Sequence, residues 1–383
     1  MKKIKVLSVF GTRPEAIKMA PLVRTLAADE RIESVVCVTA QHRQMLDQVL
    51  SAFSIVPQYD LNIMQPSQTL SSITVRTLTG LERVLEEAGP DLVLVHGDTS
   101  TTFAGALAAF YRKIPVGHVE AGLRSFDKYS PYPEEANRRL TGVLAELHFA
   151  PTQQNAENLR REGTVKNLFI TGNTVIDALH TTVQEGYRFE QPELNAIDYA
   201  GRKVVLLTAH RRENYGQPME NIVSAVSELA QNYPEALFVY PVHLSPYVQQ
   251  TAKAGLSGLP NVLLIPPLGV LDMHNLMARC HLVMTDSGGL QEEAPALGKP
   301  VLVLRRETER PEAVEAGTVL LAGTEREGIV AAARRLFDDP AAWKAMSHAV
   351  NPYGDGKACS RITRDILYYF GCVSSPASDF APF

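Results

Sequence analysis

Continuous apolar runs that end in glycine or polar residues recur along this chain, and they restrict its fold more than any other feature. KIKVLSVFG at residues 3–11, DLVLVHGD at 91–98 and RKVVLLTAH at 202–210 are examples. Continuous runs are typical of strands that are covered on both faces, whereas half-exposed strands alternate. Amphipathic stretches of helical period, such as residues 101–113, separate the runs. The pattern predicts an α/β protein with two parallel sheets in series.

The length of 383 residues also favours two domains, because one hydrophobic core seldom serves more than roughly 250 residues. We expect the chain to pass between the domains within residues 172–200, where the periodicity is weak, and the helical pattern at 362–371 to cross back onto the first domain. The predicted domains are therefore residues 1–172 with 358–383, and residues 173–357.

The composition argues against several classes of function. Hydrophobic residues make up 45% of the chain, yet no apolar run reaches the roughly 18 residues that span a bilayer. A net charge of -5 offers no basic field for nucleic acid. The four cysteines have neither metal-ligand nor redox-pair spacing, and the N-terminus has the pattern of a first strand rather than of an export signal. We therefore expect a cytoplasmic protein without membrane, nucleic-acid or metal partners.

The first run leads into GTRPEAIKM, which places two cations at the start of a helix. In open parallel sheets, ligands bind beyond the carboxyl ends of the strands, so we expect the site in a cleft between the two sheets. Arg13 at the helix start and Lys18 about one turn later suit a phosphate. The alternative interpretation is helix capping with solvated charges.

Acidic residues follow neighbouring runs of the first half. Asp98 ends one run, Glu120 ends the next, and Glu134 and Glu135 begin the helical pattern after it. General acid and base catalysis needs such groups, with one ionised and another held protonated by its surroundings. Two alternatives stay open. Asp98 can be a helix N-cap, and the acids can form an ion-pair network with nearby arginines.

The second half carries a histidine with two arginines at the end of a run. His210 is followed by Arg211 and Arg212, a combination that suits a diphosphate. His243 ends the next run and is equally consistent with an ordinary surface histidine.

The most specific motif is TDSGGLQEEAP, in which a run ends at a double-glycine turn before a helix. We expect Ser287 to cap that helix, and Gly288 and Gly289 to let backbone N–H groups approach a phosphate. Glu293, one turn into the helix, suits the two hydroxyls of a ribose. The chain has no G-x-G-x-x-G motif after the first run and no G-x-x-x-x-G-K-[ST] motif, which argues against dinucleotide and ATP chemistry.

Taken in order, these motifs resemble the non-hydrolysing UDP-N-acetylglucosamine 2-epimerases of bacteria. The resemblance rests on GTRPEAIKMAPL, HGDTSTT, HVEAGLRS, PEEANRR, TAHRREN, TDSGGLQEEAPALGKPVLVLR and TERPE, and it covers nearly the whole chain. It implies a glycosyltransferase-B-like pair of Rossmann-like domains that face a cleft. It also implies an isomerase without a cofactor, usually a homodimer, that exchanges UDP-N-acetylglucosamine and UDP-N-acetylmannosamine for surface polysaccharide.

The resemblance also implies roles for individual residues, with the carboxylates facing the sugar from the first domain and UDP held by the second. The implied catalytic residues are Asp98, Glu120, Glu134 and His210. The implied substrate-binding residues are Arg13, Lys18, Arg138, Leu268, Met273, Ser287, Gly288, Gly289, Glu293 and Arg310. Leu268 stands where some relatives have glutamine, which affects side-chain contacts to the uracil.

Some members of the family bind a second UDP-N-acetylglucosamine as an activator. The matching positions here are Gln41, His42, Gln44, Gln68 and His243. Ser67 departs from members that carry arginine before the glutamine, which weakens the case for strict activation. Three other functions remain open at this point: a UDP-sugar glycosyltransferase, a hydrolysing epimerase, and a nucleotide-sugar sensor without catalysis.

Overall fold

The structure is a computed structural model that describes residues 2–40, 43–65 and 67–382. The chain divides into two compact units. The N-terminal unit comprises Met1–Thr181 and Tyr353–Pro382, and the C-terminal unit comprises Thr182–Pro352. These bounds differ from the predicted ones because residues 173–181 and 353–357 belong to the N-terminal unit.

The N-terminal unit is built on a seven-stranded parallel sheet with the strand order β3-β2-β1-β4-β5-β6-β7. Its strands are β1 (Ile4–Phe10), β2 (Ile32–Val38), β3 (Tyr59–Asp60), β4 (Leu92–His96), β5 (Val116–Val119), β6 (Leu147–Ala150) and β7 (Leu168–Ile170). Its helices are α1 (Arg13–Ala28), α2 (Arg43–Ala52), α3 (Leu70–Ala88), α4 (Ser100–Tyr111), α5 (Glu134–Leu144), α6 (Gln153–Arg161), α7 (Thr174–Thr182, whose last residue opens the other unit) and α16 (Ala358–Tyr369).

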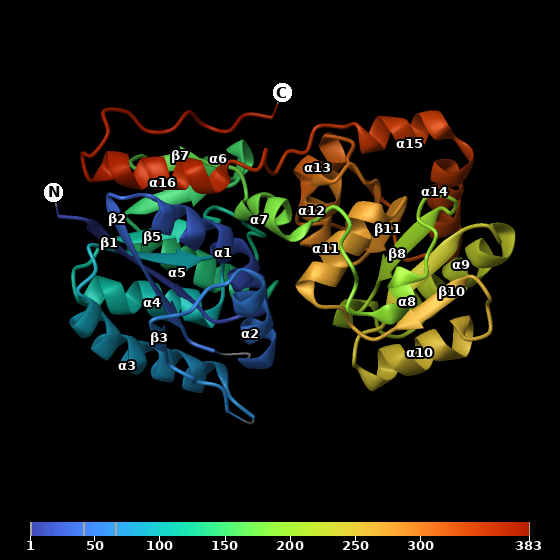
Figure 1. Ribbon diagram of the computed structural model, residues 1–383, viewed down its shortest axis with the longest axis horizontal. Helices are drawn as coiled ribbons and strands as arrows, with labels where there is room; N and C mark the ends of the chain where they lie inside the picture. The colour runs from blue at the N-terminus through green and yellow to red at the C-terminus, as the bar shows by residue number, and fades with distance from the viewer. Residues whose placement is uncertain (1, 41–42, 66, 383) are drawn as a thin grey trace. The chain divides into compact units, whose positions relative to one another are not determined.

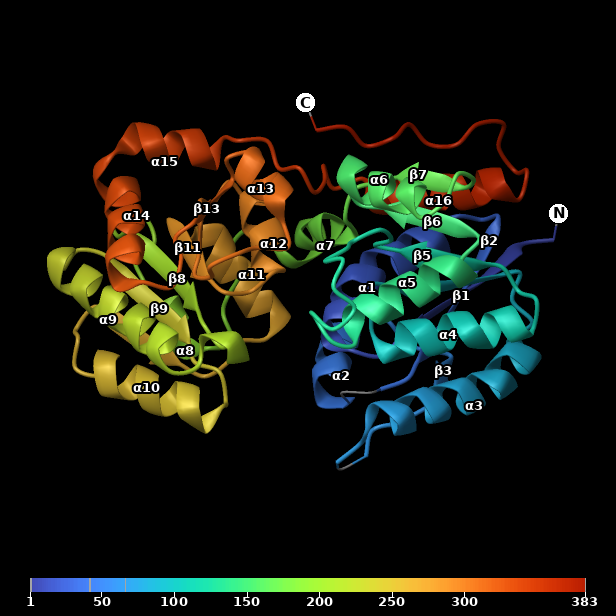
Figure 2. The same ribbon diagram turned by 180° about the vertical axis from the view of Figure 1, so that it is seen from behind.

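Helices cover both faces of this sheet. On one face α4 lies between α3 and α5, and Figure 2 shows these helices in front of the strands. On the other face α1 contacts both α2 and the C-terminal α16 (Figure 1). This double cover explains the continuous apolar runs, since the side chains of β1 and β4 are almost entirely buried on both sides of the sheet.

The C-terminal unit has a six-stranded parallel sheet with the order β10-β9-β8-β11-β12-β13. Its strands are β8 (Val204–Thr208), β9 (Leu237–Pro241), β10 (Val262–Ile265), β11 (Leu282–Thr285), β12 (Val301–Val303) and β13 (Val319–Leu321). Its helices are α8 (Pro192–Asn195), a short 3-10 helix (Arg212–Asn214), α9 (Gln217–Asn232), α10 (Pro246–Leu256), α11 (Val270–Arg279), α12 (Leu290–Ala296), α13 (Pro311–Glu315), α14 (Arg326–Asp338) and α15 (Pro340–Ser347).

The predicted fold class of two Rossmann-like parallel-sheet units is therefore confirmed. The three apolar runs quoted above form β1, β4 and β8 at the predicted places, whereas β3 and β13 have no predicted run. Both are very short strands at a sheet edge, and so few residues carry no usable hydrophobic pattern.

The return of the chain to the N-terminal unit depends on α7. The backbone N–H of Asn173 donates to the carbonyl of Tyr353 at 2.7 Å. The carboxylate of Asp177 accepts hydrogen bonds from the backbone N–H groups of Ala358 and Cys359 at the start of α16. These long-range bonds, rather than any local signal, bring residues 173–181 and 353–357 into this unit.

Within the described part of the chain, no helix is both long and apolar enough to cross a membrane.

The C-terminal tail provides a test of pH-dependent stability. Asp365 of α16 is buried, and its carboxylate accepts a hydrogen bond from Ala377 N at 2.7 Å. Burial, reinforced by the nearby Asp379, raises the pKa of Asp365 to about 7. A raised carboxyl pKa contributes stability at low pH that is lost as the pH rises through the folded-state value.

We therefore expect Asp365→Asn, which cannot ionise, to resist unfolding better than the wild type at about pH 8 but not at about pH 5. The relative gain should reach roughly 2 to 3 kcal/mol, the equivalent of about two pKa units, because the titration extends from pH 5 to the folded-state pKa of about 7. Denaturant unfolding of both proteins at the two pH values measures it. The same difference in unfolding free energy between wild type and variant at both pH values would contradict this prediction.

Candidate functional site

The turn after β1 is shaped by tight packing and by one buried acid. A Cβ atom at Gly11 would overlap the side-chain hydroxyl of Thr39, so only glycine fits there. The Glu15 carboxylate accepts hydrogen bonds from the backbone N–H groups of Gly11 at 3.0 Å and Thr12 at 2.7 Å. These bonds secure the start of α1, whose first residue is Arg13.

The second oxygen of Glu15 reaches the helix that follows β4. It accepts hydrogen bonds from the hydroxyls of Thr99 at 2.7 Å and Thr102 at 3.2 Å. Burial raises the pKa of Glu15, an effect that the hydrogen bonds from Thr99, Gly11 and Thr12 oppose. Glu15 therefore joins the turns after two central strands, a role that its place in the first turn of α1 did not reveal.

Glu120 follows β5 with a left-handed backbone (φ 61°), which is costly for a residue other than glycine. Its Oε1 accepts hydrogen bonds from the Lys18 ammonium and from Asn173 Nδ2, the latter at 3.0 Å. Its Oε2 lies 3.7 Å from Nε2 of His96. The predicted residues Lys18 and Glu120 are thus in direct contact. Asn173 and His96 were not predicted as site residues.

Asp98 and Arg138, also predicted, form a close ion pair. Arg138 donates from Nε to Asp98 Oδ2 at 2.9 Å, and its Nη2 lies 2.7 Å from the same oxygen. The neighbouring Asn137 donates to the Asp98 carbonyl. Asp98 is not the helix N-cap, because Thr99 precedes α4 and its hydroxyl accepts the N–H of Thr102.

Glu134 and Glu135 begin α5, but they differ in setting. The fully buried Glu135 accepts the N–H groups of Ser125 and Phe126 and pairs with Arg138 at 3.3 Å. Glu135 therefore forms an ion pair with an arginine, which was the alternative interpretation of these acids. Glu134 is the first residue of the helix and is partly exposed.

In the C-terminal unit a buried acid organises the end of β8. Asp286 Oδ2 accepts the backbone N–H groups of His210 and Arg211, each at 2.8 Å, and Asn214 Nδ2 at 3.1 Å. Its Oδ1 lies 3.5 Å from Nδ1 of His210. Asp286 lies within the quoted TDSGG motif, but its role was not predicted. The sequence signal that could have indicated this role is the position of the acid directly after an apolar run.

The His210 ring also stacks against His243, with the ring centroids 5.2 Å apart and the planes 12° from parallel. Partial burial lowers the pKa of His210, Asp286 opposes this effect, and His243 and Arg211 add to it. A residue predicted for catalysis thus contacts one predicted for activator binding.

The double-glycine turn after β11 brings four predicted residues together. The Arg310 guanidinium packs so closely on Gly288 that a Cβ there would lie 2.6 Å from Nη1. A Cβ at Gly289 would lie 3.1 Å from Oε1 of Glu293. Arg310 is itself held by Glu292, with 2.6 Å between Nε and Oε1.

Ser287 corrects one prediction, since it is not the N-cap of α12. That helix begins at Leu290 with Gly289 at the capping position, because the glycine pair forms a turn of its own first. Ser287 instead donates its N–H to the Thr285 hydroxyl at 2.9 Å.

Glu293 contacts a buried histidine that was not predicted. His274 Nε2 lies 3.4 Å from Glu293 Oε2, and His274 Nδ1 is hydrogen-bonded to the Thr182 hydroxyl at 2.7 Å. Met273 precedes His274 on α11, and the buried Leu268 lies just before that helix.

The predicted activator positions are only partly described. Gln41 and His42 lie outside the described residues, and Gln44 lies in α2. Gln68 accepts the backbone N–H of Gln65 at 3.4 Å. His243 uses Nδ1 to accept the N–H of Ser245.

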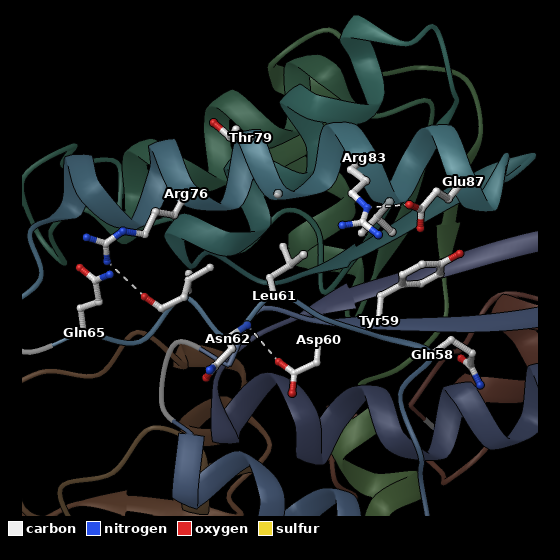
Figure 3. Close-up of a pocket in the computed structure, with 13 residues that line it drawn as sticks. Gln58, Tyr59, Asp60, Leu61, Asn62, Gln65, Arg76, Thr79, Arg83 and Glu87 are labelled. Atoms are coloured by element: carbon white, nitrogen blue, oxygen red, sulfur yellow. Dashed lines mark hydrogen bonds and ion pairs between the residues drawn. The ribbon is translucent and has the colours of Figure 1, made fainter.

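A pocket of about 600 Å³ lies between α3 and the segment around β3. Figure 3 shows Arg76 and Arg83 of α3 on one side of it and Tyr59 and Asp60 on the other. None of the predicted catalytic or substrate-binding residues lines it. Among the described residues, no cluster of three or more histidine, cysteine or acidic side chains could hold a metal ion.

Comparisons with known proteins agree with the motifs. Residues 24–367 match the protein family described as UDP-N-acetylglucosamine 2-epimerase. The UDP-N-acetylglucosamine 2-epimerase of Bacillus subtilis is 56% identical over 373 residues, 97% of each chain.

Solved structures extend this agreement. S. aureus MnaA, determined with UDP, is 52% identical with a TM-score of 0.90 and full coverage of both chains. The Neisseria meningitidis enzyme bound to UDP-GlcNAc is 51% identical with a TM-score of 0.86, covering 95% of this chain and 100% of its own.

A more distant likeness concerns the fold alone. The glycotransferase of kitacinnamycin is 14% identical with a TM-score of 0.65, covering 96% of this chain and 99% of its own. That likeness makes the fold glycosyltransferase-B-like, as predicted. With sequence identities above 50% over nearly the whole chain, this protein belongs to the UDP-N-acetylglucosamine 2-epimerase family.

Proposed function

We propose that this protein interconverts UDP-N-acetylglucosamine and UDP-N-acetylmannosamine by eliminating UDP and adding it back. Family membership over nearly the full chain is the observation that carries this proposal. The relatives determined with UDP and with UDP-GlcNAc support the choice of ligand.

The chemistry of C2 explains why a group of acids is needed. The C2 proton has no carbonyl neighbour, so it is not acidic in the bound sugar. When the bond between C1 and the UDP oxygen breaks, positive charge at C1 acidifies that proton. Its removal forms the C1–C2 double bond of 2-acetamidoglucal. UDP then returns to C1, and a proton reaches C2 from the opposite face. Two faces require two groups that handle protons.

The N-terminal unit supplies these groups in our proposal. Asp98 and Glu120 follow the neighbouring strands β4 and β5, and each is paired with a cation, Arg138 and Lys18 respectively. Glu134 at the start of α5 is the third candidate. The paired cations keep Asp98 and Glu120 in place.

The C-terminal unit holds UDP in our proposal. Gly288, Gly289 and the adjacent Arg310 accommodate the diphosphate, and Glu293 accepts hydrogen bonds from the ribose. Ser287, Leu268 and Met273 complete the nucleotide site. His210, together with Arg13 of the N-terminal unit, stabilises negative charge on the departing diphosphate, which is commonly the largest catalytic contribution.

Several finer features belong to the same proposal. A second UDP-N-acetylglucosamine would act as activator through Gln41, His42, Gln44, Gln68 and His243, and Ser67 makes strict activation less favourable. The predicted homodimer and the supply of precursors for surface polysaccharide also rest on the family resemblance, and the predicted cytoplasmic location rests on the spacing of the cysteines.

The fold favours one second candidate, a UDP-sugar glycosyltransferase, because a glycotransferase shares the architecture. Such an enzyme would not need several carboxylates with paired cations at the ends of β4 and β5. A hydrolysing epimerase would release free sugar, and a sensor would turn nothing over.

The proposal predicts solvent exchange at C2. Incubation with UDP-N-acetylglucosamine in deuterated water should give a mixture with UDP-N-acetylmannosamine, and both should carry deuterium at C2 by NMR. Free N-acetylmannosamine with UDP, transfer to an added acceptor, or an unchanged substrate would contradict the proposal and favour hydrolysis, glycosyl transfer or sensing respectively.

Glu120→Gln separates proton transfer from nucleotide binding. We expect C2 exchange to fall about a hundredfold or more, as is usual when a general base is lost, while the dissociation constant for UDP changes little. Arg13→Ala is the matched variant, and it should weaken UDP binding roughly tenfold. Exchange assays and calorimetric titration with UDP measure the two effects. Normal exchange in Glu120→Gln would remove this residue from the mechanism.

Asp286→Ala tests whether the buried acid serves His210. The substitution leaves two backbone N–H groups and the Asn214 amide without their acceptor, so stability should fall by about 1 to 3 kcal/mol. Asp272→Ala is the control, since the buried Asp272 of the same unit accepts three similar bonds.

Both variants should lose stability in denaturant unfolding, but only Asp286→Ala should also lower kcat, because it alone releases His210. Equal kcat values for the two variants would show that Asp286 is purely structural.

A further inference from the structure

His96 is a buried histidine whose ring has no hydrogen-bond partner within the described part of the chain. It is the last residue of β4 and is only 3% exposed. Neither Nδ1 nor Nε2 makes a hydrogen bond to another described residue. Leaving a buried polar group unsatisfied costs free energy, so such a group calls for a functional explanation.

The nearest acid to His96 is Glu120, and the two oxygens of that carboxylate have different surroundings. Oε1 accepts hydrogen bonds from the Lys18 ammonium and from the Asn173 amide. Oε2 faces the other way, 3.7 Å from Nε2 of His96. Gly97 also lies close to this oxygen, since a Cβ atom at Gly97 would be 3.2 Å from Oε2. His96 is thus placed beside Oε2, while the bonds from Lys18 and Asn173 described above reach Oε1.

The His96 ring is neutral at physiological pH. Burial lowers its pKa to about 4, a shift that Glu120 and Asp98 oppose and that Lys18 reinforces. His118, on the neighbouring strand, is also neutral because burial lowers its pKa to about 3. A neutral imidazole carries one N–H donor and one acceptor, so His96 can donate to a carboxylate without forming an ion pair.

We propose that His96 is a positioning residue for Glu120, and that its Nε2–H holds Oε2 in the orientation needed for proton transfer at C2. The gap of 3.7 Å closes to a hydrogen bond when substrate is bound, since catalytic hydrogen bonds are often long in a free enzyme. This inference rests on the proposed epimerase function and adds to it a residue that does not itself touch the reacting atoms.

Two other buried histidines of the same sheet provide a comparison, since each leaves only Nδ1 without a described hydrogen-bond partner, whereas His96 leaves both ring nitrogens. His118 Nε2 is hydrogen-bonded to the Gly97 carbonyl at 2.7 Å. His148 of β6 is 4% exposed, and burial lowers its pKa to about 4, as for His96. No carboxylate lies within ion-pair distance of His148 among the described residues. It is therefore the matched control.

The test compares His96→Leu, His96→Gln and His148→Leu. We expect His96→Leu to lower C2 exchange roughly tenfold or more without a change in UDP affinity, and to move the acid limb of the pH–rate profile to higher pH, because a lost hydrogen bond disfavours the ionised carboxylate. His96→Gln should retain part of the activity through its amide donor, and His148→Leu should keep the wild-type profile. Equal losses in His96→Leu and His148→Leu with an unshifted acid limb would overturn the inference.

A second measurement does not depend on turnover. The carboxyl carbon of Glu120, assigned by its absence in Glu120→Gln, is titrated by ¹³C NMR in wild type and in His96→Leu. A higher midpoint in the variant supports the inference, and identical titration curves overturn it. Wild-type protein that fails to exchange C2 would instead overturn the proposed function, so the two failures are distinguishable.

Discussion

The arrangement of the N-terminal unit depends on one buried carboxylate, that of Glu15. Its four hydrogen bonds join the turn after β1 to the start of α4, which follows β4. These two strands are neighbours in the sheet. The burial of an acid is unfavourable unless its lone pairs are satisfied, and the four donors supply that compensation. Glu15 thereby holds the turn before Arg13 against the start of α4, just after Asp98, at the carboxyl ends of these two strands.

In the C-terminal unit, a different buried acid joins the loops after two neighbouring central strands. β8 and β11 are neighbours, as β1 and β4 are, and the strand order reverses between them. Here Asp286, at the end of β11, accepts the backbone N–H groups after β8. In parallel sheets this point of reversal leaves a crevice where ligands bind. Each unit therefore uses one buried acid to join the loops that follow its two central strands.

Much of this could be predicted from the sequence, because continuous apolar runs report strands and because most site residues directly follow them. Lys18 and Glu120 were predicted separately and prove to be in contact. Residues that act through long-range contacts were missed: Asn173 reaches Glu120 across 53 positions of the chain, and His96 looked like part of a strand. Ser287 was misplaced because a serine before two glycines resembles a helix cap, although the turn continues to Gly289.

The two sides of the Glu120 carboxylate also bear on how it can act. A carboxylate whose oxygens were both bound to cations would be a poor proton acceptor, since each cation stabilises the ionised form. In this structure the ammonium and the amide share Oε1, while a neutral imidazole and a glycine border Oε2. The left-handed backbone of Glu120 is the strained feature that turns the carboxylate into this position. A neutral imidazole at Oε2 can hold the carboxylate by one hydrogen bond without a second full positive charge beside it, so it favours the ionised form less than a cation there would.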